Sequence, residues 1–273
     1  MINMLDILKG FEVNKVKHAI IGAGVIGFAT GVWLEANKQE VKFYDINKET
    51  VKKIQKKGYK ASYKVDAMTI RKHDPAIIWI CTAEWDVEKV IKNIYEYNAE
   101  KIYVVRSTMP PGETEKIAYK YGLIHVAHIP EFLRQNNAID DIFNEDRIII
   151  GAVDERTILF LKDIYKHETA PVIFTDMKTS ALIKYASNCW LSTQISYWNE
   201  IKKICDGLEV NPQAVANAVC LDKRISKYGS AMLGKPYGGA CFPKDMTALI
   251  QAFDDKKINP ELLKAVKEVN ETL

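Results

Sequence analysis

The sequence predicts an α/β protein in which a Rossmann-type domain with a doubly wound parallel sheet precedes an all-helical domain. Short β-rich runs alternate with helical stretches as far as Asp176, which is typical of βαβ units. Most of these runs are apolar throughout, as strands covered on both faces are. Beyond Asp176 the strand signal disappears. We therefore place the domains at residues 1–176 and 177–273, with a short N-terminal extension at residues 1–16.

The strand candidates are spaced along the first domain, and helices fit between them, for instance at Val25–Asn37 and Asp154–Lys166. A short helix is also expected near the N-terminus, ahead of the first strand. The predicted strands are His18–Ile21, Glu40–Tyr44, Ala76–Cys81, Lys101–Arg106, Ile124–His128, Arg147–Val153 and Val172–Phe174.

The second domain is predicted to contain only helices. Lys178–Cys205 is expected to form one long helix, since it contains no internal Gly or Pro. Three further helices are expected at Pro212–Cys220, Pro243–Phe253 and Pro260–Leu273. A loop rich in Gly, Ser and Lys, Asp222–Ala240, joins the first two of these, and loops of that length are often functional.

Composition excludes several classes of protein. The formal net charge is only +3, so we expect neither a nucleic-acid surface nor a membrane-seeking face. No apolar run approaches the roughly 20 residues of a membrane span, and the N-terminus lacks the pattern of a secretory signal. The five cysteines contain no Cys-x-x-Cys pair, which favours a reducing cytoplasm over a disulfide framework. The histidines show no metal-ligand spacing, so no metal is expected.

A glycine-rich segment, Gly22-Ala-Gly24-Val-Ile-Gly27, follows the first predicted strand and opens the first predicted helix. In that context Gly22 makes a tight turn, Gly24 lets a pyrophosphate approach, and Gly27 allows close helix–sheet packing. Asp45 ends the second predicted strand, where its carboxylate would accept hydrogen bonds from a ribose diol and repel a 2′-phosphate. The segment therefore predicts a dinucleotide site that favours NAD over NADP. The alternative is a glycine-rich turn that binds no ligand.

The segment Tyr237-Gly-Gly-Ala-Cys-Phe-Pro-Lys-Asp245 places one cysteine after a glycine pair and ahead of a proline. Because proline fits the first turn of a helix, Cys241 is predicted to lie near a helix N-terminus, where the dipole favours a thiolate. Lys244 adds positive charge nearby, and Asp245 can hold a water or a proton. This setting suits a nucleophilic cysteine. The alternative is a small buried thiol in a tight turn.

The sequence resembles the UDP-glucose/GDP-mannose dehydrogenase family through nearly the whole chain. Besides the two segments above, the resemblance is carried by Ser107-Thr-Met-Pro-Pro-Gly112, by Pro130-Glu-Phe-Leu-Arg134 with Ala138-Ile-Asp and Asp146-Arg-Ile after it, and by Ile183-Lys-Tyr-Ala-Ser-Asn188. It implies NAD-dependent oxidation of a nucleotide sugar, with UDP-glucose favoured, at C6 from alcohol to carboxylate. It also implies that Cys241 forms a thiohemiacetal and then a thioester, which water cleaves.

The resemblance further implies roles for individual residues. Lys184 and Asn188 lie four residues apart, so they share one helix face and would stabilise the alkoxide and oxyanion. Thr108 and Asp245 would hold the hydrolytic water, and Glu131 would act as a base or position that water. The alternatives are a solvated Lys184 and a helix-starting Glu131. The implied cofactor-binding residues are Gly22, Gly24, Val25, Ile26, Gly27, Asp45, Thr82 and Thr108. The implied substrate-binding residues are Phe132, Leu133, Arg134, Arg224, Tyr237, Gly238 and Gly239.

The sequence departs from the family pattern in three places. Gln135 stands where many members carry a second acid, and Pro236 stands where a glycine is usual. The family also continues into a second nucleotide-binding-type domain beyond the point where this chain stops, at Leu273. The substrate pocket is therefore expected to be open on one side, in a chain that is shortened, split or naturally short. A separate chain carrying that domain is one expected partner, and a second copy is another, because the helical half of the family mediates dimerisation.

Two other interpretations remain open. The chain could be a non-catalytic or partner-dependent module that binds NAD. It could also be a β-hydroxyacid dehydrogenase, a class that shares a Rossmann domain followed by helices and uses a catalytic lysine. That class would not need the block around Cys241.

Overall fold

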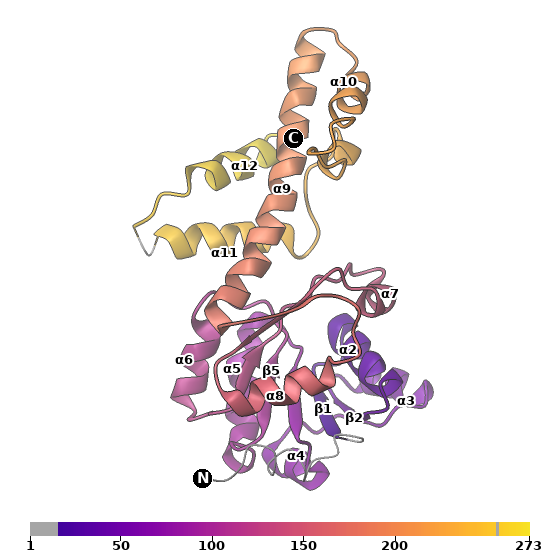
Figure 1. Ribbon diagram of the computed structural model, residues 1–273, viewed down its shortest axis with the longest axis vertical. Coiled ribbons are helices and arrows are strands. Elements are labelled where there is room, and N and C mark those ends of the chain that lie inside the picture. Colours follow the sequence, from indigo (N-terminus) through magenta and orange to yellow (C-terminus); the bar gives the residue numbers. More distant parts are fainter. Residues whose placement is uncertain (1–15, 255–256) are drawn as a thin grey trace. The chain divides into compact units, whose positions relative to one another are not determined.

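The computed structural model describes residues 16–254 and 257–273, which form two compact units that divide after Ala181 (Figure 1). The division falls inside helix α9 (Met177–Gly207), a few residues beyond the boundary that the sequence predicted at residue 176. The predicted N-terminal extension and its short helix lie, except for Val16, outside the described residues.

The first unit is built on an eight-stranded sheet with the order β3-β2-β1-β4-β5-β6-β7-β8. Its first six strands follow the Rossmann order 3-2-1-4-5-6. Neighbouring strands are parallel except β6 and β7, which are antiparallel. The strands are β1 (Lys17–Ile21), β2 (Glu40–Tyr44), β3 (Ala61–Ser62), β4 (Ile77–Ile80), β5 (Ile102–Val105), β6 (Val126–His128), β7 (Ile148–Ala152) and β8 (Val172–Thr175).

These observations confirm the predicted doubly wound α/β fold, and all seven predicted strands are present. Two details differ from the prediction. The sequence missed β3, since a strand of two residues is too short to show a pattern. It also predicted a parallel sheet throughout, because a buried apolar run looks the same whichever way the strand points.

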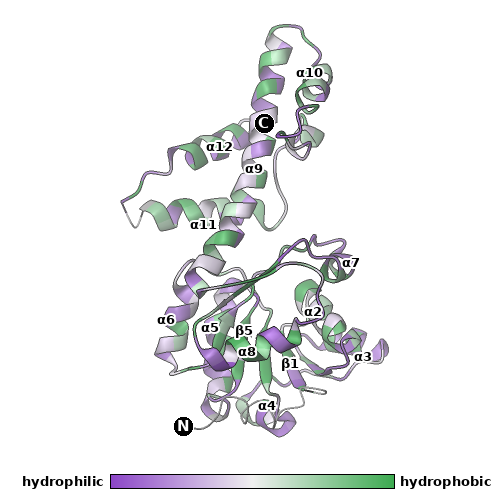
Figure 2. Ribbon diagram, viewed as in Figure 1, coloured by the Kyte–Doolittle hydropathy of each residue, from purple (hydrophilic) through white to green (hydrophobic). Residues whose placement is uncertain are grey.

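Helices cover both faces of the sheet, so the sheet's two faces carry two separate apolar clusters. One face packs against α2 (Val25–Ala36), α3 (Lys48–Lys56), α7 (Ala138–Phe143) and α8 (Glu155–Ile164). The other packs against α4 (Ala67–His73), α5 (Val87–Ile94) and α6 (Glu113–Lys120). Two short 3₁₀ helices, η2 (Glu84–Asp86) and η3 (Tyr95–Tyr97), flank α5. Colouring by hydropathy shows mostly apolar strands between helices that carry both hydrophilic and hydrophobic residues (Figure 2).

The second unit is helical in its described part, as the sequence predicted. It contains the remainder of α9, then α10 (Pro212–Val219), the 3₁₀ helix η4 (Gly229–Met232), α11 (Phe242–Asp254) and α12 (Glu261–Glu271). Helices α11 and α12 lie side by side (Figure 1). A core of Tyr185, Cys189, Met246, Leu249 and Val266 joins them to α9.

Candidate functional site

The first candidate site lies at the carboxyl ends of β1, β2 and β4, where ligands of doubly wound sheets bind. A pocket of about 340 Å³ opens there. Of the predicted cofactor-binding residues, Gly22, Gly24, Asp45 and Thr82 line it. Four of the eight predicted cofactor-binding residues therefore line one cavity.

Two of the three glycines of the fingerprint, Gly22 and Gly27, are required by the local geometry. Gly22 has φ +87°, a conformation that side chains rarely adopt. A Cβ on Gly27 would lie 1.8 Å from the Gly22 carbonyl oxygen, so only glycine lets α2 pack this closely on the turn. Around Gly24 the space is open, with nothing within 4 Å of a Cβ at that position. Gly24 also leaves the first turn of α2 without a capping side chain, as suits a helix N-terminus that receives phosphates.

Asp45 links the glycine turn to the end of β2. Its Oδ2 accepts the Ala23 N–H at 2.8 Å and its Oδ1 accepts the Asn47 N–H at 2.8 Å. Each carboxylate oxygen can accept more than one hydrogen bond, so the side chain is held in place and can still accept a ribose hydroxyl. These residues fit a bound NAD.

Other predicted cofactor residues lie outside the lining of this pocket. Val25 and Ile26 begin α2, and Gly27 is buried against the turn. Thr108 follows β5 and is half-buried. The sequence missed Val65, Lys89 and Asn93, which line the pocket. They carry no motif and are brought there by the loop after β3 and by α5.

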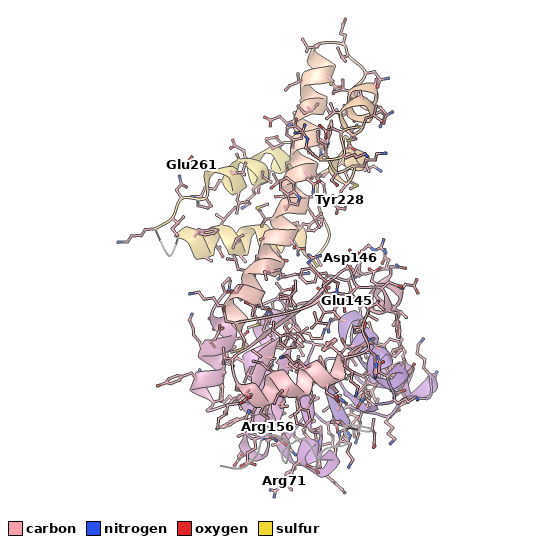
Figure 3. All side chains as sticks on the ribbon, viewed as in Figure 1. Arg71, Glu145, Asp146, Arg156, Tyr228 and Glu261 are labelled. Atoms are coloured by element: carbon pink, nitrogen blue, oxygen red, sulfur yellow. The ribbon has the colours of Figure 1, made fainter. Side chains whose placement is uncertain are left out.

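A second cavity, of about 460 Å³, is lined in part by the predicted substrate-binding residues Phe132, Leu133 and Arg134, which directly follow the predicted base Glu131. Figure 3 shows two of its acidic residues, Glu145 and Asp146, close to each other. Asp140 and Asp141 of α7 add two more carboxylates. Within the segment, Glu131 is buried and accepts the Leu133 N–H through Oε2 at 2.7 Å.

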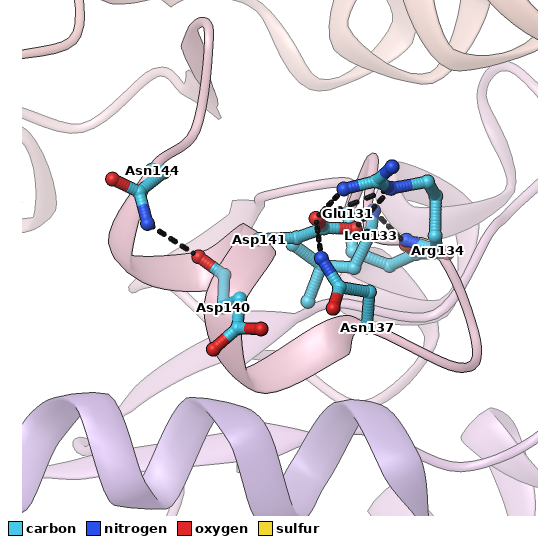
Figure 4. Close-up of polar contacts among 7 residues, drawn as sticks. All are labelled: Glu131, Leu133, Arg134, Asn137, Asp140, Asp141 and Asn144. Atoms are coloured by element: carbon cyan, nitrogen blue, oxygen red, sulfur yellow. Dashed lines mark hydrogen bonds and ion pairs between the residues drawn. The ribbon is translucent and has the colours of Figure 1, made fainter.

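Arg134 is tied to Asp141 by several hydrogen bonds (Figure 4). The backbone N–H donates to Oδ2 at 2.7 Å, and the guanidinium donates through Nε to Oδ2 at 3.0 Å and through Nη2 to Oδ1 at 2.5 Å. Asn137 donates to the same carboxylate at 2.9 Å. The Arg134 guanidinium holds the pKa of Asp141 well below its usual range. The predicted substrate residue Arg134 therefore already has an anionic partner within the protein.

Glu145 has an unusual electrostatic environment. Burial raises the pKa of its carboxyl to about 7, although the Arg106 cation opposes that rise. Arg106 is itself buried, and its Nη1 donates to the Tyr165 hydroxyl at 3.5 Å. Burial works against its charge, yet the nearby Tyr165 and Glu145 raise the pKa of Arg106. A buried cation and a carboxyl that tends to keep its proton thus lie near the predicted base Glu131.

In the second unit, the structure brings together three of the predicted catalytic residues. Lys184, Asn188 and Asp245 are only 4%, 6% and 1% exposed. The Asn188 amide donates to Asp245 Oδ2 at 2.6 Å, which joins α9 to α11. Lys244 Nζ lies 2.8 Å from Asp245 Oδ1, an ion pair by distance. Lysine and aspartate are almost never buried without polar partners, and Asp245 has two such partners, Asn188 and Lys244. The burial of Lys184 contradicts the alternative of a solvated side chain.

Cys241 directly precedes α11, and its carbonyl accepts the Asp245 N–H at 2.8 Å, the first bond of that helix. The predicted position at a helix N-terminus is therefore confirmed. Cys241 is an exposed residue, which contradicts the alternative of a small buried cysteine in a tight turn. Cys189, by contrast, is buried, and burial together with the Asp245 charge raises the pKa of its thiol to about 12. Of these two cysteines, Cys241 is the one that a substrate can reach.

The remaining predicted substrate residues differ in exposure. Gly238 and Gly239 are exposed, while the Tyr237 side chain is buried in the core of the unit. The predicted loop Asp222–Ala240 contains η4. Arg224 is exposed and pairs with Asp222, Nη2 to Oδ2 at 2.6 Å.

Models of one protein family match both units of the chain. The NAD binding domain of the UDP-glucose/GDP-mannose dehydrogenase family matches residues 83–169, and the central domain of that family matches residues 178–272. A ketopantoate reductase PanE/ApbA model also matches residues 18–106. Among residues 16–254 and 257–273, no helix combines the length and apolar character that a bilayer crossing requires.

Relatives and solved structures agree with these matches. UDP-glucose 6-dehydrogenase YwqF of Bacillus subtilis is 42% identical over 180 residues, which cover 63% of this chain and 40% of that protein. TuaD, a UDP-glucose 6-dehydrogenase of the same species, is 31% identical over 292 residues, which cover 93% of this chain and 63% of TuaD. The structure of a UDP-glucose dehydrogenase from Pyrobaculum islandicum is 29% identical with a TM-score of 0.86, over 94% of this chain and 68% of that one.

The chain thus spans less than two thirds of the length of these two Bacillus relatives. Its two units nevertheless match the family's NAD binding and central domains in the same order. The chain belongs to the UDP-glucose/GDP-mannose dehydrogenase family.

Proposed function

We propose that the chain oxidises a nucleotide sugar, UDP-glucose in the first instance, at C6 from alcohol to carboxylate, with NAD as the oxidant. The observation that carries this proposal is the position of Cys241. It is an exposed cysteine at the start of α11, one turn before the buried Asp245–Asn188 pair. An NAD site alone would need none of this arrangement. Similar chains are named UDP-glucose 6-dehydrogenases, which favours UDP-glucose among substrates.

NAD would supply the hydride acceptor for both oxidations. In the first, the C6 hydroxyl loses a proton and C6 loses a hydride, which leaves an aldehyde. Lys184 would stabilise the alkoxide that forms as the proton leaves. The Cys241 sulfur then adds to the aldehyde carbon, and the former carbonyl oxygen takes a proton to give a thiohemiacetal.

The second oxidation removes a hydride and a proton from the thiohemiacetal and leaves a thioester on Cys241. A water adds to the thioester carbon, the C–S bond breaks, and the carboxylate and thiol are released. Asn188 and Lys184 would stabilise the oxyanion of this step. Within the second unit, Asp245 would hold the water.

The test is NADH formation by the purified chain with a panel of UDP- and GDP-sugars. We expect turnover with UDP-glucose and a loss of about 10³-fold or more in Cys241→Ser, because removing a nucleophile removes the whole covalent route. Cys220→Ser is the matched control: its thiol contacts Ser226 and Ser230, and its turnover should match the wild type. No NADH with any sugar would exclude this function for the chain.

A second candidate is an NAD-binding module without catalysis. It is favoured by one observation: the described residues that line the pocket around Gly22 and Asp45 all belong to the first unit. Calorimetry in which NAD binds and no sugar nucleotide binds would support this candidate over the first.

We also propose that the chain forms a homodimer through α9. Trp190, Tyr197 and Ile204 follow one another at seven-residue intervals, so they share one helix face. They are 61%, 53% and 52% exposed, and an apolar stripe of this kind is typical of an interface.

A further inference from the structure

The segment Gly234–Tyr237, which leads into Cys241, is held by an asparagine on α9. Asn199 is fully buried. Its Nδ2 donates to the Lys235 carbonyl at 2.7 Å, and its Oδ1 accepts the Gly234 N–H at 2.7 Å. One carboxamide therefore bonds one backbone acceptor and one backbone donor, which uses both ends of the side chain.

A second asparagine holds the other end of the same segment from α12. Asn270 Oδ1 accepts the Tyr237 N–H at 2.7 Å, and Asn270 Nδ2 donates to the Tyr237 carbonyl at 3.2 Å. The Tyr237 side chain is only 3% exposed and packs in the core of the unit. Two carboxamides from two helices thus bond the backbone of three residues in this four-residue segment, Gly234, Lys235 and Tyr237.

Pro236 fits between these contacts. Proline has no backbone N–H, and the two asparagines bond the Gly234 N–H, the Lys235 carbonyl and both backbone groups of Tyr237. The two asparagines act as clamps on the segment Gly234–Tyr237. This segment needs no backbone donor at position 236, and the fixed φ of proline removes conformational freedom from it. The departure from the family's usual glycine is therefore compatible with a rigid segment.

The reason to fix this segment lies in the residues that follow it. Gly238, Gly239 and Ala240 are exposed, and glycines leave the backbone free to move. Cys241 beyond them starts α11, whose Met246 and Leu249 are buried in the core. The position of the thiol is defined only if the chain is anchored on both sides of the glycine pair.

We propose that Asn199 and Asn270 are positioning residues that hold Cys241 at the N-terminal end of α11. This inference rests on the proposed function, because it gives Cys241 the role of nucleophile. Release of either clamp lets the exposed residues before Cys241 move, so the thiol leaves the helix N-terminus that favours its thiolate.

The test measures the alkylation rate of each cysteine by iodoacetamide, resolved by peptide mass spectrometry. The variants are Asn199→Ala and Asn270→Ala. Asn259→Ala is the matched control, since that exposed asparagine on the approach to α12 bonds the side chains of Glu261 and Lys264. We expect the rate at Cys241 to fall about fivefold in both clamp variants and to stay unchanged in the control.

Buried cysteines report on folding in the same samples. Cys189, Cys205 and Cys220 are buried, so their rates should stay at the wild-type level in every variant. Asn270→Asp keeps an acceptor for the Tyr237 N–H and lacks the donor, so its rate at Cys241 should lie between those of Asn270→Ala and the wild type. An unchanged or higher rate at Cys241 would overturn the proposal. So would a parallel rise at the three buried cysteines, because the asparagines would then serve general stability.

Turnover separates this inference from the proposed function. In the clamp variants kcat with UDP-glucose should fall by the same factor as the alkylation rate, with an unchanged KM for NAD. A wild-type chain that gives no NADH would defeat the proposed function, while the alkylation rates would still decide whether the two asparagines position Cys241.

Discussion

At the scale of single residues, the Glu145 carboxyl has a pKa that burial shifts clearly. Its pKa is raised to about 7 from an ordinary 4.5 because burial disfavours the charged form. Between pH 4.5 and 7 the unfolded chain loses this proton while the folded chain keeps it. Folding stability attributable to Glu145 is therefore complete below pH 4.5, falls as the pH rises to 7, and is constant above that.

Glu145→Gln should remove this pH dependence. The free energy of unfolding of the variant relative to the wild type should rise between pH 4.5 and 7, by at most about 3 kcal/mol. Urea denaturation at several pH values measures it. A difference between the two proteins that does not vary with pH would show that Glu145 titrates normally.

The Arg134–Asp141 pair makes a second prediction at the residue scale. Asp141 is 14% exposed and bonds both the backbone and the guanidinium of Arg134. Asp141→Asn should lower the free energy of unfolding by about 1 kcal/mol, since charge-assisted bonds at a partly exposed site are lost.

Asp140→Asn is the matched control for that measurement. Asp140 is the neighbouring carboxylate in the same pocket, and Asn144 donates a hydrogen bond to its backbone carbonyl. Urea midpoints that fall equally in both variants would contradict a specific role for Asp141.

At the scale of elements, the turn between β1 and α2 shows why two glycines of one motif are not equivalent. A Cβ on Gly27 would lie 1.8 Å from the Gly22 carbonyl oxygen, whereas a Cβ on Gly24 would have nothing within 4 Å. Gly27 is needed for folding. Gly24 occupies open space at the pocket, where a ligand would approach.

Gly27→Ala should therefore destabilise the chain by about 3 kcal/mol or more, because α2 must move off the turn. Gly24→Ala should fold with nearly wild-type stability and bind NAD at least about tenfold more weakly, since its methyl group occupies the pyrophosphate's place. Thermal unfolding and NAD calorimetry on both variants measure the two effects. Equal melting temperatures would contradict the assignment of the packing role to Gly27.

Element prediction from the sequence was accurate where patterns are long and local. Lys178–Cys205 lacks Gly and Pro, and α9 spans Met177–Gly207. The apolar strands were found within two residues at each end. The direction of β7 against β6 was not predicted, because strand direction depends on the path of the chain and not on the pattern of the strand itself.

At the scale of the whole molecule, the proposed dimer makes a prediction of its own. Trp190→Glu combined with Tyr197→Glu places two charges in the apolar stripe of α9. The dimer dissociation constant should then rise about 100-fold or more, because each buried charge lacks a partner. Sedimentation velocity over a concentration series measures it.

Tyr119→Glu is the control for the dimer, since Tyr119 is 92% exposed in the first unit. Its sedimentation should match that of the wild type. A wild-type chain that sediments as a monomer at every concentration would contradict the proposed interface.

The sequence by itself determined the fold class, the order of the two units and the positions of the glycine and cysteine motifs. These depend on local patterns: apolar runs, helix-compatible stretches, and glycines followed by a helix. It also placed Cys241 at a helix start, since the proline two residues later has one favourable position.

Only the tertiary structure decided which side chains share an environment. It paired Arg134 with Asp141, buried Tyr237, put Glu145 near Arg106, and brought Asn199 and Asn270 to the segment before Cys241. No local pattern marks the two asparagines, because their partners are backbone groups 33 to 36 residues away along the chain. Such contacts arise from the packing of helices, which the sequence specifies only through the whole fold.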